Sequence, residues 1–435
     1  MKFSALDKDI LRIALPSIVS NITVPLLGLV DLAIVGHLGS TSYIGAISLG
    51  GMVFNVIYWI FAFLRMGSSG LTAQSYGAND VKGLTLTLWR SVITGVMLSV
   101  VLMAFQPLIL HLARLLMRPE EDISDLMGIY FHICIWGALP SLCLFALTGW
   151  MIGMQDSRGP MWVAILQNVI NIIASLLFVY GFGMKVEGVA LGTLTAQYCG
   201  CLIAGLIVWR SHGKRICHVG WKDVLSHDGM GRFFKVNRDI FFRTICLVSV
   251  FLFFTSAGSW QGGKILASNT LLMQFYMLFS FIMDGFAFSG EALSGRFLGA
   301  SDSQSLHKLT HRLFVWGAWM TIIFTFAYLF GGDLIVRLLT NEEDVISCSA
   351  DFMPWVWVLP VASVAAFIWD GIFIGTTASR LMFYSSAISA IVFFSVYFSL
   401  SPTLHNHALW LAFIMYMITR GLSQTIMYRV KLRRI

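Results

Sequence analysis

Twelve long apolar runs, separated by short polar stretches, are the feature of this 435-residue sequence that most restricts its fold. A helix needs roughly 20 apolar residues to cross a hydrocarbon core about 30 Å thick, and only helices and closed barrels satisfy their backbone hydrogen bonds inside lipid. The runs predict an all-α integral membrane protein with twelve transmembrane helices. They fall at about residues 10–36, 42–72, 87–111, 127–152, 160–183, 187–209, 240–259, 265–295, 309–331, 349–375, 380–400 and 407–428.

The composition agrees with a membrane location. Hydrophobic residues make up 57% and charged residues 12% of the sequence, and the mean hydropathy is +0.78, which excludes an ordinary soluble domain. The net charge of +7 comes from basic residues in loops, where it indicates membrane orientation rather than nucleic-acid binding. We expect a multi-pass protein of the cytoplasmic (inner) membrane with both termini cytoplasmic. The seven cysteines predict neither disulfides nor a metal site.

The two halves of the sequence are similar to each other at an offset of 222 residues. Gly77-Ala78-Asn79-Asp80 aligns with Gly299-Ala300-Ser301-Asp302, and WMIGMQDSR aligns with IFIGTTASR at the same offset. Two matches at one offset indicate a six-helix unit used twice, and an even number of spans gives both copies the same orientation. We expect two six-helix lobes related by a pseudo-twofold axis along the membrane normal. Their expected boundaries are 1–212 for the N-terminal lobe, 213–236 for a basic cytoplasmic linker and 237–435 for the C-terminal lobe.

Longer motifs in a fixed order carry a family resemblance over nearly the whole chain. They are VDLAIVGHLG, FLRMGSSGLTAQSYGAND, QNVINIIASLLFVYGFGMKVEGVALGT, NRDIFFRTICL, MDGFAFSGEALSG and WDGIFIGTTASR. The sequence resembles the multidrug and toxic compound extrusion (MATE) transporters, in particular their DNA-damage-inducible (DinF-like) branch. The resemblance implies twelve helices in two lobes. It also implies export of organic, often cationic and amphipathic, compounds against inward movement of protons or sodium ions.

One acid, Asp31, lies within the first apolar run. An ionised carboxylate inside a bilayer costs at least about 2.5 kcal/mol, so it needs a function or a partner. Either Asp31 binds and releases a proton, or it is a helix-end acid capped by the backbone near His37, Gly39 and Ser40. The resemblance favours the first interpretation, and it implies that Pro16 bends the first helix.

A polar face is expected on the fifth helix. Asn168 and Asn171 are three residues apart, and Asn171 and Ser175 are four apart, so they project from one side. This face either bonds Asp31 and supplies oxygens to a cation, or only fixes helix packing. The resemblance implies that Thr193 is the family's sixth-helix hydroxyl, whereas Ser175 stands where many members have an acid. Without that second carboxylate, a proton site is favoured over a sodium site.

Three further acids lie in the second half. Asp284 and Glu291 are seven residues apart on the eighth helix, and Asp370 is on the tenth. They form a candidate second-lobe site for a coupling ion or a substrate cation. The alternative is structural ion pairing, in which Arg243 or Arg296 neutralises Glu291.

The sequence contains no phosphate-binding glycine loop, paired metal-binding histidines or activated nucleophile, so we expect no enzyme activity, metal or cofactor. The expected function is secondary-active antiport of small organic molecules against protons or sodium ions, by a monomer in the lipid bilayer with no nucleic-acid partner. A flippase for lipid-linked precursors is the alternative, although we would expect it to have more arginines in mid-span. A receptor or scaffold would need neither buried acids nor duplicated halves.

Overall fold

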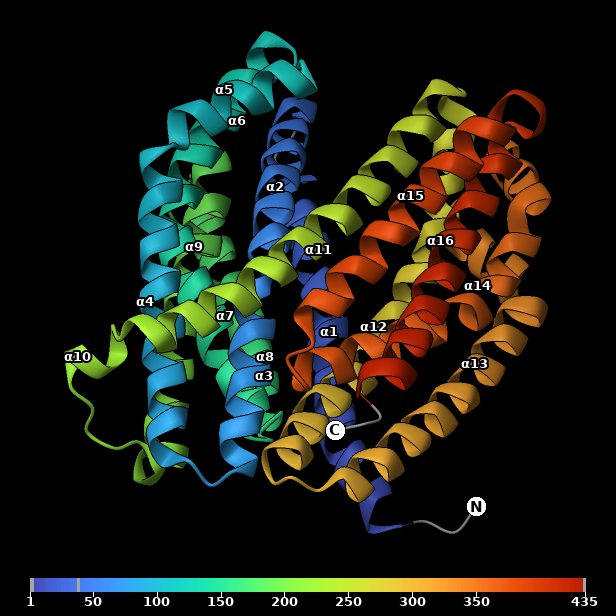
Figure 1. The fold of residues 1–435 in the computed structure, drawn as a ribbon. Coiled ribbons are helices and arrows are strands. Elements are labelled where there is room, and N and C mark those ends of the chain that lie inside the picture. Colours follow the sequence, from blue (N-terminus) through green and yellow to red (C-terminus); the bar gives the residue numbers. More distant parts are fainter. Residues whose placement is uncertain (1–3, 37–39, 433–435) are drawn as a thin grey trace. The chain divides into compact units, whose positions relative to one another are not determined.

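The computed structural model describes residues 4–36 and 40–432, and within these ranges the regular elements are all helices (Figure 1). Ten helical segments are long and apolar enough to cross a membrane. The helices of the first half are α1 (Ala5–Gly36), α2 (Thr41–Phe61), α3 (Phe63–Gly77), α4 (Val81–Ala104), α5 (Gln106–Met117), α6 (Glu121–Cys134), α7 (Ala138–Gly153), α8 (Arg158–Leu176), α9 (Val186–His212) and α10 (Trp221–Val224). The later ones are α11 (His227–Trp260), α12 (Gly263–Gly299), α13 (Ser303–Leu339), α14 (Glu343–Gly375), α15 (Ser379–Leu404) and α16 (Asn406–Met427).

Several expected spans differ from the observed helices. The run at 42–72 is divided between α2 and α3, and the run at 87–111 is divided at Phe105, after which α5 begins. Pro107 lies in the first turn of α5, where a residue without an amide hydrogen costs nothing and would be costly further inside a helix. Helix α11 begins ten residues before the expected end of the linker at 236.

The chain divides into two compact units, each described by itself. The first unit is Val19–Phe234; the second contains the residues up to Ile18 and those from Lys235 onward. Helix α1 therefore begins in the second unit and ends in the first. Its early part is held there by the Ser289 hydroxyl, which donates to the Ile10 carbonyl at 2.8 Å, and by the Trp316 indole, which donates to Asp7 at 3.1 Å.

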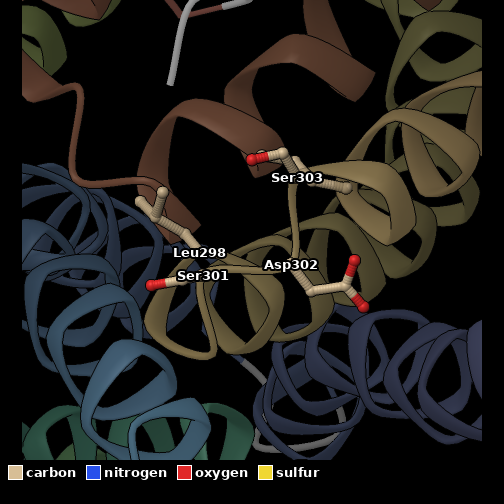
Figure 2. Close-up of a pocket in the computed structure, with 5 residues that line it drawn as sticks. Leu298, Ser301, Asp302 and Ser303 are labelled. Atoms are coloured by element: carbon tan, nitrogen blue, oxygen red, sulfur yellow. The ribbon is translucent and has the colours of Figure 1, made fainter.

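The internal repeat is confirmed at the level of the backbone. Asn79 and Ser301 have left-handed φ values of 53° and 56°, and Gln155 and Thr377 have values of 63° and 52°; each pair is 222 residues apart. The carboxylates that follow the first pair cap helices identically. Asp80 accepts from the Gly83 amide and Asp302 from the Ser305 amide, both at 2.9 Å. Figure 2 shows the second of these turns, which lines a small pocket.

The same helix pair packs closely in each unit. In the first unit Gly149 of α7 lies directly against the backbone carbonyl of Arg65 on α3, and in the second Gly371 of α14 lies against the carbonyl of Ala287 on α12. A side chain at either glycine would meet backbone rather than a movable group. Both units therefore contain a closely packed helix pair that only glycine allows at these positions.

Candidate functional site

Asp31 lies in the last part of α1, inside the first unit. Its side chain is buried, with 8% of the residue exposed. Oδ2 accepts a hydrogen bond of 3.4 Å from the Thr193 hydroxyl of α9, and Oδ1 has no hydrogen-bond partner among the described residues. His37 and Gly39, which the capping interpretation involves, lie outside the described residues. Asp31 therefore has a side-chain partner on another helix.

The polar face of α8 reaches this carboxylate through Thr193. Asn171 is fully buried and its amide donates to the Thr193 hydroxyl at 3.1 Å. Asn168 instead donates to the Thr23 carbonyl of α1 at 2.7 Å. Ser175 is fully buried and lies against Gly192 of α9. The structure thus joins Asn171, Thr193 and Asp31, while Asn168 ties α8 to α1.

The chemistry available at Asp31 is that of a carboxyl group among neutral neighbours. No ion pair to Asp31 occurs among the described residues, and its printed hydrogen bonds come from an alcohol and, through it, an amide. A buried carboxyl in such surroundings is expensive when charged and inexpensive when protonated. In the described part of the chain no group of three or more His, Cys, Asp or Glu side chains could hold a metal ion.

Asp370 lies in the second unit in very different surroundings. The carboxylate on α14 is 6% exposed and forms ion pairs with Arg243 of α11 and Arg420 of α16, both buried as well. The Gln424 amide of α16 donates to its other oxygen at 2.7 Å. Two guanidinium groups and an amide thus surround one carboxylate and join three helices.

The two arginines were not expected in this role. Arg243 was considered as a partner for Glu291, and the structure pairs it with Asp370. Arg420 was seen as a residue near the edge of a span. The argument against a flippase relied on few arginines in mid-span, and it is weakened because two lie buried within helices. Both face a carboxylate, so neither is a free positive charge.

The remaining predicted residues are more scattered. Glu291 of α12 is fully buried, whereas Asp284 is partly exposed and accepts a hydrogen bond of 3.4 Å from Ser280. Pro16 lies within α1, two residues before the point where this helix passes from the second unit to the first. No printed contact joins Asp284 or Glu291 to the Asp370 cluster.

One polar pair outside the membrane-spanning helices was also not foreseen. Asp156, in the turn between α7 and α8, faces His212 at the end of α9 with 3.0 Å between Oδ2 and Nε2, and accepts from the Gly159 amide at 3.0 Å. Partial burial alone would raise the pKa of Asp156, but the bonds from His212 and the Gly159 amide hold that pKa below its usual value.

Comparison with known proteins adds a family to this geometry. The family model described as MatE matches residues 16–200 and 240–398. The chain is 33% identical to DNA damage-inducible protein F of Escherichia coli (strain K12) over 428 residues, covering 97% of this chain and 92% of that protein. It is 21% identical to the probable multidrug resistance protein NorM of Thermotoga maritima over 350 residues, covering 79% and 74% of the two chains.

Solved structures agree on the fold. A MATE protein crystallised in the bent conformation matches with a TM-score of 0.90 at 18% identity, covering 99% of this chain and 96% of that one. The fold class expected from the sequence is confirmed by this match. The relatives are membrane transporters, and the family is not one of enzymes. With its family model and its long similarity to a DNA damage-inducible protein F, the chain belongs to the MATE family of multidrug and toxin extrusion transporters.

Proposed function

We propose that this protein exports organic, cationic or amphipathic compounds in exchange for protons, with Asp31 as the proton-binding group. The observation that carries the proposal is a buried carboxylate whose hydrogen-bond partners are neutral, on a helix of a family of transporters. A carboxyl group that gains or loses a proton there changes its free energy strongly, because no cation offsets its charge.

The proposed cycle uses the hydrogen bonds around Asp31. When Asp31 is ionised, it favours a cationic substrate nearby, since opposite charges attract strongly where water is scarce. When a proton binds, that attraction is lost, and the bonds to Thr193 and through it to Asn171 rearrange. Bending of α1 at Pro16 would then alter the space for substrate. Coupling requires only that proton and substrate favour different states of the protein.

The proton is favoured over sodium because of the fifth-helix face. A hard cation prefers several oxygen ligands with charge, and the group four residues after Asn171 is the Ser175 hydroxyl rather than a second carboxylate. Asn168, a further possible oxygen donor, is used to bond the Thr23 carbonyl. The first unit thus offers one titratable oxygen pair and little else for a sodium ion.

We propose a structural role for Asp370. Its carboxylate faces two guanidinium groups and an amide, so the place that a substrate or coupling cation would need is taken by the protein's own cations. In this view the cluster holds α11, α14 and α16 together. Asp284 and Glu291 remain candidates for contact with substrate, and the sequence pattern is their main support.

Ethidium efflux from proteoliposomes tests the proposal. An imposed proton gradient should drive efflux, and an imposed sodium gradient with the proton gradient collapsed should not. Serine-to-aspartate substitution at position 175 supplies a positive control, because Ser175→Asp adds the second carboxylate and should increase sodium dependence. Sodium-driven efflux by the unmodified protein that is lost in Asn171→Ala would contradict the assignment of the proton.

A further inference from the structure

An open groove lies on the first unit where the early part of α4, the end of α9 and the segment after α9 meet. Its volume is about 370 Å³, and three of its lining residues are tryptophans, Trp89, Trp209 and Trp221. They are 42%, 74% and 68% exposed. Figure 1 shows α10, which carries Trp221, beside α4. Tryptophan is enriched at this depth of membrane proteins because its ring suits the boundary between lipid and water.

The groove is held in shape by specific bonds. The Arg90 side chain of α4 donates to the carbonyls of Asp223 and Val224, both at 2.9 Å, and fixes α10. The Cys217 amide donates to the Thr85 hydroxyl at 3.1 Å. Behind these contacts the Trp150 indole donates to the Leu84 carbonyl at 2.9 Å within a buried apolar cluster. The segment after α9 is therefore docked on the helices.

The segment that forms one wall is basic. Residues 209–222 read WRSHGKRICHVGWK and contain no acid. The four Lys and Arg side chains in this stretch are all exposed; they are Arg210, Lys214, Arg215 and Lys222. One of the two histidines, His212, is bonded to Asp156. Basic clusters next to a membrane attract anionic lipid headgroups.

An apolar track continues from the groove along α9. Leu202, Leu206 and Trp209 recur every three to four residues, so they share one side of the helix, and they are 67%, 58% and 74% exposed. A ligand that satisfies the whole surface needs a negative group at the basic end and an apolar chain along this track. A soluble anion has no use for the track, and a zwitterionic lipid leaves the basic side chains uncompensated.

We infer that this groove binds a phospholipid with an anionic headgroup. The phosphate faces the basic side chains of the segment 209–222, and an acyl chain lies over Trp209 and the leucines before it. Because the segment leads into the connection between the units, a bound lipid also fixes the start of that connection. The binding site is separate from Asp31 and does not depend on the proposed coupling ion.

Native mass spectrometry of the full-length protein in a neutral detergent tests the inference. The purified protein is titrated with phosphatidylglycerol and, separately, with phosphatidylcholine. We expect retention of phosphatidylglycerol in preference to phosphatidylcholine, and a loss of about tenfold in that retention in the double variant Lys214→Gln/Lys222→Gln, since each basic side chain near the headgroup contributes appreciably. Trp209→Ala should weaken binding of both lipids.

Matched variants keep the test specific. Lys308→Gln removes an exposed lysine of α13, and Trp162→Ala removes an exposed tryptophan of α8; both should bind lipid as the wild type does. Equal retention of the two lipids, no retention by the wild type, or unchanged retention in the double variant at an unchanged melting temperature would overturn the inference. Displacement by soluble glycerol phosphate would show a free-anion site instead, and would overturn it equally.

Discussion

The two units place opposite chemistry at equivalent positions on a shared backbone. The first has Asp31 and Asn171 where, 222 residues later, the second has Phe253 and Phe393, whose ring centroids are 5.9 Å apart in an aromatic cluster. Conversely, Asp370 of the second unit corresponds to Thr148 of the first, whose hydroxyl donates to the Leu144 carbonyl of its own helix. The duplicated turns and glycine contacts show that the scaffold has been kept while the buried polar groups have moved.

This difference teaches how a buried acid can be used in two ways. Asp31 has neutral partners, so its charge is free to change with little structural cost. Asp370 is fixed by two arginines, so removal of its charge would leave two buried cations facing each other. A titratable site and a structural ion cluster thus differ in their partners rather than in the acid itself. The predictions below separate these roles, beginning with the largest effect.

Asp31→Asn should abolish gradient-driven efflux and leave stability almost unchanged. The amide has the size of the carboxyl group and can still accept from Thr193, so only the titratable charge is lost. Efflux of ethidium from proteoliposomes and the melting temperature in detergent are the measurements. Asp122→Asn, an exposed acid in the same unit, should transport normally. Near wild-type efflux by Asp31→Asn at equal expression would refute its role.

Asp370→Asn should do the reverse and act first on stability. Breaking a buried ion pair by removing one partner costs about 3–5 kcal/mol, so the melting temperature should fall and all substrates should be affected alike. Arg243→Met should cost less, because Asp370 keeps Arg420 as its partner. If Asp370→Asn instead keeps its melting temperature and loses only cationic substrates, the carboxylate contacts substrate and the structural role is wrong.

Gly149→Ala and Gly371→Ala should destabilise the two units by similar amounts. In each case a new methyl group meets a backbone carbonyl on the neighbouring helix, and overpacking of this kind costs about 1–3 kcal/mol. Gly331→Ala in α13 is the control, since a side chain there meets nothing within 4 Å. Thermal melting of the three variants compares them. A large loss for one of the paired glycines and none for the other would show that the shared scaffold differs at this contact.

Asp156→Asn should have the smallest effect, about 1 kcal/mol at neutral pH, since it removes a charge-assisted hydrogen bond at a partly exposed site. The pKa of Asp156 is lowered in the folded protein, so its stabilising contribution is present above the ordinary carboxyl pKa and is lost as the pH falls through the folded value. The stability difference between wild type and variant should therefore shrink only below about pH 4. A difference that disappears already near neutral pH would contradict this.

Much of the fold was predictable because lipid restricts the choices. Apolar runs of sufficient length have to be helices, and the repeat could be recognised from Gly77 to Asp80 and their counterparts. The break at Ala62 could not, since the sequence there is apolar on both sides and contains no proline. The extent of α11 was also missed, because a polar stretch that continues a helix beyond the membrane resembles a loop.

The site was predictable in part. Asn171 and Ser175 share a helix face by spacing alone, and the family resemblance added Thr193. The Asp370 cluster was missed because its partners are distant in sequence: Arg243 is 127 residues away and Arg420 is 50. Hydropathy places an arginine near a span without saying which acid it faces. A pair of arginines in apolar helices beside a lone acid is the signal that could have suggested this cluster.

Substrate-induced proton release tests the central claim most directly. Purified protein in a weakly buffered solution with a pH-sensitive dye is mixed with a cationic substrate at a pH where Asp31 is partly protonated. The account predicts proton release by the wild type, release by Arg243→Met, which retains the Asp370 to Arg420 pair, and none by Asp31→Asn. Release that persists in Asp31→Asn, at wild-type affinity for the substrate, would show that another group exchanges the proton and would contradict the account.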